Sequence, residues 1–177
     1  MTDGSAESAL IVEVPAAESL VARWREAHDP MAALGVPAHV TILYPFVQPE
    51  RLTAARLAAV AEVAAAHRPF RTRFVRVAAF PTAIYLDPEP DEPFRALTAA
   101  FEARFPDHPP YGGRFDDVVP HLTIAMGEPS ELDGLADRIA ADLGPRLPLE
   151  VRVADLGLLV SAETSWSRRA TFRLGRG

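Results

Sequence analysis

The chain has 177 residues, 49% of them hydrophobic, with no cysteine and a formal net charge of −6, a composition that suits one globular domain or two small lobes sharing an interface. The absence of cysteine excludes disulfides and cysteine–zinc sites, and the negative charge disfavours a broad, nonspecific nucleic-acid binder. Without cysteine, a recognisable signal peptide or an apolar run long enough to span a membrane, we expect a cytoplasmic protein.

The first half of the chain predicts three strands separated by two helices. Residues 1–7 are small and polar, and we expect them to be disordered. After them, apolar periodicity and the bordering Pro and Gly residues predict strands at 10–14, 38–44 and 70–79 and helices at 15–28 and 49–67.

The second half predicts the same order of elements, followed by one more strand. Ser130 and Asp133 have the spacing of a capping box at the start of a helix. The periodicity predicts strands at 83–86, 121–126, 149–160 and 170–174 and helices at 91–105 and 130–143.

Because the two halves share an order of elements but few letters, we interpret them as a duplication. The predicted fold class is α+β, in a single domain over residues 1–177 whose lobe-forming halves are residues 8–80 and 81–175. We expect each lobe to contain an antiparallel sheet and two helices. A pseudo-twofold axis then relates the lobes across a cleft that holds the active site.

One short pattern occurs in a strand of each half: a histidine, an apolar residue, a threonine and another apolar residue, at 39–42 and 121–124. Side chains i and i+2 of a strand share a face, so each copy presents an imidazole and a hydroxyl together. A single histidine in an apolar strand is usually structural. Two copies in matching contexts instead predict a paired site made of His39, Thr41, His121 and Thr123.

The remaining histidines lie at predicted helix ends or in a Pro-rich loop, where a structural or solvent-exposed role is ordinary. They are His28, His67 and His108.

The paired motifs and their surroundings resemble the two-histidine (2H) phosphoesterase superfamily, in particular its 2′-5′ RNA ligase-like branch. The resemblance covers about residues 10–174 and is carried by GVPAHVTILYPF (35–46), FPTAIYL (80–86) and PYGGRFDDVVPHLTIAMG (110–127). It implies a bilobal α+β fold with the active site between the lobes, and catalytic pairs at His39 with Thr41 and His121 with Thr123. It also implies chemistry without metal or cofactor on 2′,3′-cyclic phosphates or 2′-5′ phosphodiesters.

The residue types suit this chemistry. One imidazole can activate water as a base while the other protonates the leaving ribose oxygen, and the sequence does not say which does which. The threonine hydroxyls can hold the non-bridging phosphate oxygens. In the reverse sense, a 5′-hydroxyl could attack a cyclic phosphate and give ligation without ATP.

Other substrate contacts are predicted from residue type. Tyr85, Tyr111 and Trp166 are candidates for stacking on a base, and Arg168 for contacting a phosphate. Tyr44 has the same chemistry, but strand alternation places it on the core side of its strand. Weaker candidates of the same two kinds are Phe46, Arg71, Arg73, Arg76 and Arg169.

No convergent set of metal ligands is evident, since Asp116 and Asp117 are the nearest acidic pair and lie in a loop. The leading hypothesis is a metal-independent phosphodiesterase that acts on 2′,3′-cyclic nucleotides, RNA-end phosphodiesters or 2′-5′ linkages. The alternatives are a non-catalytic nucleotide- or RNA-end-binding module and an ATP-independent 2′-5′ RNA ligase, which the acidic net charge disfavours. The expected partner is a small nucleotide or RNA end, with neither a membrane nor an obligatory protein partner.

Overall fold

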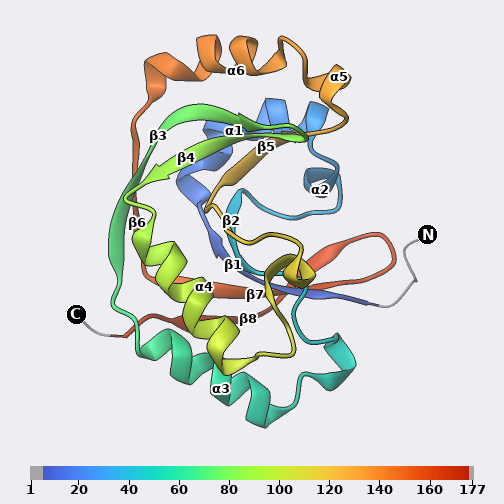
Figure 1. Cartoon of the computed structure of the whole chain (residues 1–177), viewed down its shortest axis with the longest axis vertical. Helices are drawn as coiled ribbons and strands as arrows, with labels where there is room; N and C mark the ends of the chain where they lie inside the picture. Colours follow the sequence, from blue (N-terminus) through green and yellow to red (C-terminus); the bar gives the residue numbers. More distant parts are fainter. Residues whose placement is uncertain (1–5, 176–177) are drawn as a thin grey trace.

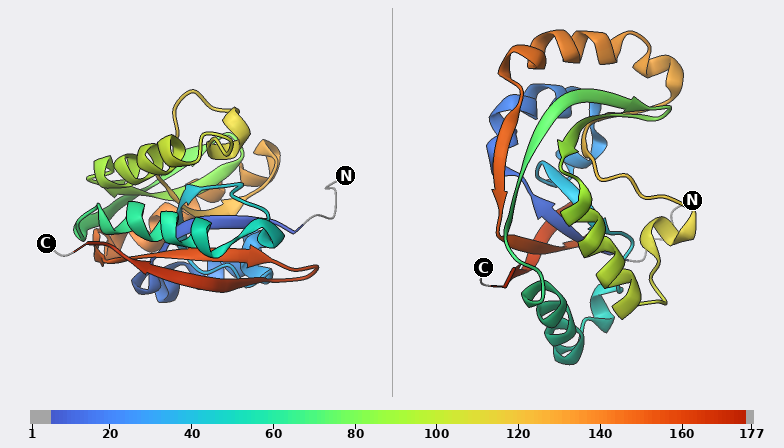
Figure 2. Two further views of the ribbon diagram at one scale, coloured as in Figure 1. Left: turned by 90° about the horizontal axis from the view of Figure 1, so that it is seen from below. Right: turned by 60° about the vertical axis from the view of Figure 1, so that its left-hand side comes forward.

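A computed structural model describes residues 6–175 as an α+β fold built on one antiparallel sheet, which confirms the predicted class. The sheet curls into an open half-barrel (Figures 1 and 2), with the strand order β6-β3-β4-β5-β2-β1-β7-β8. Its strands are β1 (Ser8–Glu13), β2 (His39–Leu43), β3 (Phe70–Phe80), β4 (Ala83–Glu89), β5 (Leu122–Met126), β6 (Leu149–Val153), β7 (Asp155–Ser161) and β8 (Trp166–Arg173).

The four longer helices cover the sheet in two pairs. Helix α1 packs against β5 and α6 against β3, whereas α4 packs against β2 and α3 against β8 (Figure 1). The helices are α1 (Pro15–His28), α2 (Pro30–Ala33), α3 (Ala54–Ala65), α4 (Glu92–Arg104), α5 (Pro129–Leu132) and α6 (Leu135–Leu143), with 3₁₀ turns η1 (Pro49–Arg51), η2 (Pro110–Gly113) and η3 (Gly144–Arg146).

Strand pairing does not follow the two sequence halves 8–80 and 81–175. Strand β3, from the first half, pairs with β4 and β6, while β7 and β8 from the second half extend the sheet beyond β1. The reason is local: β3 and β4 form one hairpin, closed by a turn at Pro81 and Thr82, so the sequence boundary falls inside a hairpin. On either side of the central pair β2 and β5, the sheet therefore combines strands from both halves of the sequence.

The two motif strands lie side by side at the centre of the sheet, with Val40 opposite Leu122. These two side chains, with Ile42 and Ile124, are buried in the main core on the helix-covered face. A shift of one strand by one residue would turn its core side chains to the other face. Since burying an aliphatic side chain contributes roughly 1.5–3 kcal/mol, burial fixes which face carries the histidines.

Two long elements predicted from periodicity are each divided. The predicted helix at 49–67 is the turn η1 followed by α3, because the Thr53 hydroxyl accepts a hydrogen bond from the Arg56 amide and starts a new helix. The predicted strand at 149–160 is β6 and β7, which lie at different places in the sheet on either side of Ala154. Strand β8 begins at Trp166, earlier than the predicted residue 170.

The predicted capping box at Ser130 and Asp133 is wrong. Glu128 and Glu131 form the capping box of the short helix α5 instead. Helix α6 starts separately after Gly134, whose φ of +67° a side chain would disfavour.

Glu7, in the segment predicted to be disordered, makes two hydrogen bonds to residues far away in the chain. Residues 1–5 of the predicted disordered segment lie outside the described residues, but Glu7 is held on both sides. Its amide donates to the Ser161 hydroxyl at 2.7 Å, and its carboxylate accepts from the Tyr44 phenol at 2.8 Å. The prediction of disorder is therefore wrong at Glu7.

The helix starts can be tested by removing two hydroxyls. Thr53→Ala should lower the free energy of unfolding by about 1 kcal/mol, because it removes the N-cap of α3. Ser130→Ala, at the position that the sequence alone favours, should change it by less than about 0.5 kcal/mol. Urea unfolding of both variants measures the difference. A larger loss for Ser130→Ala would show that the caps are assigned to the wrong residues.

Candidate active site

Both motifs open onto one cavity of about 300 Å³. His39, Thr41, His121 and Thr123 all line it, and all four are only partly buried, because strand alternation turns them away from the main core. The antiparallel register that pairs Val40 with Leu122, continued by one residue each way, sets each histidine across from the other motif's threonine.

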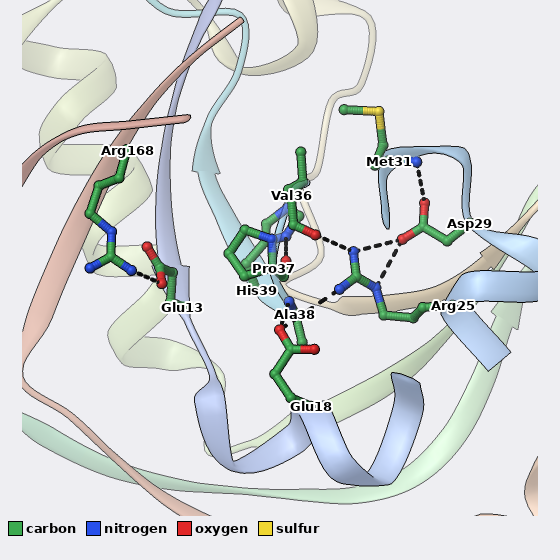
Figure 3. Close-up of polar contacts among 10 residues, drawn as sticks. All are labelled: Glu13, Glu18, Arg25, Asp29, Met31, Val36, Pro37, Ala38, His39 and Arg168. Atoms are coloured by element: carbon green, nitrogen blue, oxygen red, sulfur yellow. Dashed lines mark hydrogen bonds and ion pairs between the residues drawn. The ribbon is translucent and has the colours of Figure 1, made fainter. Parts of the chain in front are cut away.

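Each histidine is held by the carbonyl two residues before it. Nδ1 of His39 lies 2.7 Å from the Pro37 oxygen (Figure 3), and Nδ1 of His121 lies 2.7 Å from the Val119 oxygen. A carbonyl only accepts hydrogen bonds, so Nδ1 must donate. In the neutral imidazole this leaves Nε2 as an unprotonated acceptor, available for proton transfer.

Burial favours the neutral form of both rings. It lowers the pKa of His39 to about 4, and the nearby cation of Arg25 and the second histidine act in the same direction, against the hydrogen bond to Pro37 and the carboxylate of Asp29. Burial also lowers the pKa of His121. An anionic phosphate bound between the rings would favour their protonated forms, so the same pair can accept and donate protons.

Tyr85 lies behind His121 and not in the cavity wall. Its ring stacks on Phe80, with centroids 4.3 Å apart, and both rings contact the His121 imidazole, at 5.5 Å and 5.2 Å. Within residues 6–175, the cavity-lining side chains do not include Tyr85. Phe80 was missed in the sequence, where it is one apolar residue at a strand end.

Besides the two imidazoles, the aromatic side chains of residues 6–175 that line the cavity are Tyr44, Tyr111 and Trp166. The predicted core orientation of Tyr44 is wrong, because the pairing of β2 with β1 shifts register near its end and the consecutive residues Ile42 and Leu43 are both buried in the main core. Tyr44 instead meets Trp166 edge-on, with centroids 6.2 Å apart. The Tyr44 carbonyl accepts a hydrogen bond from the Tyr111 amide at 2.5 Å. Tyr111 has a left-handed φ of 52°, which is uncommon for a non-glycine residue.

The predicted arginine candidates lie elsewhere. Arg168 pairs with Glu13 of β1 (Figure 3), beside a neighbouring hollow of about 230 Å³. Arg71 and Arg73 line a hollow of about 480 Å³ on β3, and Arg76 pairs with Asp87 at 2.6 Å. Among the described residues, no arginine lines the histidine cavity.

The other three histidines lie outside the cavity. His28 stacks on Trp24, His67 bonds the Val63 carbonyl through Nδ1 at 2.8 Å, and His108 packs against Phe46.

Residues 6–175 were also compared with the requirements of a metal site and of a membrane-spanning helix. No group of three or more His, Asp or Glu side chains there is arranged to hold a metal ion. No helix in the same part of the chain has the length and apolar character needed to cross a membrane.

A sequence model of the 2′-5′ RNA ligase superfamily matches residues 12–164. The chain belongs to this superfamily. The resemblance to 2H phosphoesterases carried by the two motifs is thereby confirmed. A comparison of the chain with curated proteins gave no match.

Several solved structures share the fold of this chain. TT0787 of Thermus thermophilus is 20% identical, with 95% of this chain and 97% of that chain covered and a TM-score of 0.61. E. coli LigT complexed with NADP+ is 15% identical, with 98% and 99% covered and a TM-score of 0.60. Kluyveromyces marxianus Usb1 is 14% identical, with 97% and 98% covered and a TM-score of 0.51. At these identities the likeness concerns the fold.

The low pKa of His39 predicts a stability that depends on pH. Below about pH 6.5 the unfolded imidazole binds a proton that the folded one, with a pKa of about 4, does not. The free energy of unfolding should therefore fall by about 1–2 kcal/mol between pH 7 and pH 5 because of His39. In His39→Asn, whose amide can still donate to Pro37, this part of the loss should disappear. Urea unfolding at both pH values measures it, and equal losses in the two proteins would contradict the assignment.

Proposed function

We propose that the protein is a metal-independent phosphodiesterase that hydrolyses 2′,3′-cyclic nucleotides or RNA-end phosphodiesters, or 2′-5′ linkages, in the cytoplasm. His39 and His121 act as its general base and general acid. The observation that carries the proposal is the matched pair of imidazoles in one cavity, each with Nδ1 bonded to a backbone carbonyl and Nε2 left for proton transfer.

The proposed hydrolysis needs two proton transfers around one phosphorus atom. Nε2 of one histidine takes a proton from water, and the water oxygen forms a new bond to phosphorus. The bond from phosphorus to a ribose oxygen breaks, and that oxygen takes the proton from the other histidine. General acid–base assistance of this kind contributes roughly 10² to 10⁴ in rate. The hydroxyls of Thr41 and Thr123 donate to the non-bridging oxygens.

The charges around the cavity support a diester substrate. Among the described residues no arginine lines the cavity, and the Asp29 carboxylate in its wall is paired with Arg25, so the phosphate is held by the threonine hydroxyls and the two imidazoles. A cyclic diester carries one negative charge, whereas the monoester product carries about −1.5 to −2 at pH 7. With no described arginine in the wall, no fixed cation compensates the extra negative charge of the product, which favours release of the product.

The aromatic wall supports a nucleotide as the substrate class. Tyr111 and Trp166, with Tyr44, offer ring faces and edges beside the motif residues, and base–aromatic stacking is worth roughly 1–3 kcal/mol per base. The structural neighbour LigT has been crystallised with 3′-AMP and with NADP+. We assign Tyr85 to the support of the His121 ring, and Arg168 to an outer position beside the cavity.

The superfamily name keeps ATP-independent ligation as the second candidate, in which a 5′-hydroxyl replaces water. A net charge of −6 disfavours the several phosphate contacts that a long RNA needs. Incubation with 2′,3′-cyclic nucleotides, a 2′-5′ dinucleotide and RNA with a cyclic end separates the candidates by their products. Hydrolysis of the cyclic nucleotides in excess chelator is the expected result, and binding without any product would indicate a binding module.

The histidine pair is tested in the same assay. His39→Ala and His121→Ala should each lower kcat by at least roughly 10²-fold, because each removes one of two proton transfers in one step. The double variant should be only modestly worse than the poorer single variant, since the two residues act as a unit.

His67→Ala is the matched control, because its imidazole also bonds a backbone carbonyl but lies outside the cavity. Its kcat should stay near that of the wild type. A folded His39 or His121 variant with wild-type kcat would exclude the two-histidine mechanism.

The threonines are tested by keeping their shape and removing the hydroxyl. Thr41→Val and Thr123→Val should each reduce kcat/KM by the equivalent of roughly 1.5–3 kcal/mol, if each hydroxyl donates to a charged oxygen in the transition state. Steady-state kinetics and melting curves measure activity and folding separately. Wild-type kcat/KM in both variants would make the threonines structural.

A further inference from the structure

The backbone before each histidine is bonded by an arginine from the preceding long helix. Arg25 of α1 donates from Nη2 to the carbonyl of Val36 at 2.9 Å, three residues before His39 (Figure 3). Arg95 of α4 donates from Nη1 to the carbonyl of Val118 at 3.2 Å, three residues before His121. The same contact thus occurs at the same position relative to both histidines.

Each arginine is fixed by an aspartate four residues away. Nε of Arg25 lies 3.0 Å from Asp29, which also accepts from the Met31 amide (Figure 3). Nε of Arg95 lies 2.7 Å from Asp91. A guanidinium is a rigid fork of donors, so fixing one edge on a carboxylate also fixes the direction in which the other donors point.

A second contact secures each segment. In the first copy, the Ala38 amide donates to Glu18 of α1 at 2.6 Å. In the second copy, Arg95 also bonds Asp117 at 2.6 Å, next to Val118. In the first copy the Pro37 oxygen, which accepts from His39, lies in the backbone between the two anchors. In the second copy the Val119 oxygen, which accepts from His121, belongs to the residue that follows the anchors directly. Each arginine therefore bonds the carbonyl of the residue directly before the one whose oxygen accepts from the histidine.

The two helices occupy equivalent places in the fold. Helix α1 precedes β2 and packs on β5, whereas α4 precedes β5 and packs on β2. The two helices share little sequence beyond the arginine and the aspartate that make these contacts. A purely local packing role would not require the same carbonyl to be bonded in both copies.

We propose that Arg25 and Arg95 are positioning residues, each of which holds its histidine in the Nδ1–H tautomer with Nε2 toward the cavity. The kinetic part of the proposal rests on the proposed function, but the tautomer can be measured without turnover. The two copies differ in accessibility, since the side chain of Arg25 is 4% exposed and that of Arg95 is 37% exposed. Removing Arg25 alone would leave Asp29 buried without its partner, so Arg95 gives the cleaner test.

The test is the ¹⁵N NMR spectrum of protein labelled in histidine, at pH 7.5. In the wild type both rings should show the Nδ1–H tautomer. In Arg95→Gln the shorter amide cannot bridge Asp91 and Val118, so His121 should show a mixture of tautomers while His39 stays unchanged. Arg95→Lys should restore the tautomer only in part, because an ammonium lacks the fork.

Arg146→Gln is the matched control. Arg146 is also an exposed arginine with an aspartate four residues away, at 3.4 Å, but that aspartate is Asp142 at the end of α6. Both histidines should keep their tautomers in this variant. For the first copy, Arg25→Gln with Asp29→Asn removes both buried charges together, and the mixture should then appear at His39 alone.

The kinetic readout is the split between kcat and KM. Arg95→Gln should lower kcat by roughly 10-fold or more, because small misplacements of reacting groups cost this much, with KM within about twofold of wild type. A folded Arg95→Gln protein with wild-type tautomers and wild-type kcat would overturn the proposal. Lack of turnover in the wild type would reject the proposed function, while the tautomers would still decide the role of the arginines.

Discussion

The site depends on one interaction that occurs twice, the hydrogen bond from histidine Nδ1 to the carbonyl two residues earlier. Strand alternation puts each imidazole on the open face, but alternation alone does not choose which ring nitrogen carries the proton. The carbonyl makes that choice, because it can only accept. The buried apolar side chains of β2 and β5 then hold the two rings at the centre of the sheet, where one cavity serves both.

The two copies are alike in geometry and unlike in electrostatics. Beside His39 lies the buried ion pair of Arg25 and Asp29, in which the cation lowers the pKa of the ring and the carboxylate raises it. His121 instead contacts the rings of Phe80 and Tyr85, and its arginine, Arg95, is more exposed and bonds two carboxylates. The duplicated scaffold thus places two equivalent imidazoles in different charged and aromatic surroundings, while burial lowers the pKa of both.

The sequence predicted the parts that follow from local periodicity. Alternation and paired spacing predicted the motif strands and the shared face of each histidine and threonine. Tyr44 was assigned to the wrong face because a register shift near the end of β2 buries both Ile42 and Leu43, which periodicity does not reveal. The partner of Arg168 was also out of reach, because Glu13 lies 155 residues away in the chain. The bond from Arg25 to Val36 depends on how the chain after α1 folds back along the helix, which periodicity does not show. Strand exchange between the halves depends in the same way on long-range pairing.

The central claim is that both imidazoles contact one phosphate from opposite sides. A crystal structure of the protein soaked with a nucleoside 2′- or 3′-monophosphate tests it most directly. We predict the phosphate inside the histidine cavity, with Nε2 of His39 and Nε2 of His121 each roughly 2.6–3.2 Å from a different phosphate oxygen. A phosphate bound by only one of the imidazoles, or seated instead in the hollow beside Arg71 and Arg73, would contradict the claim.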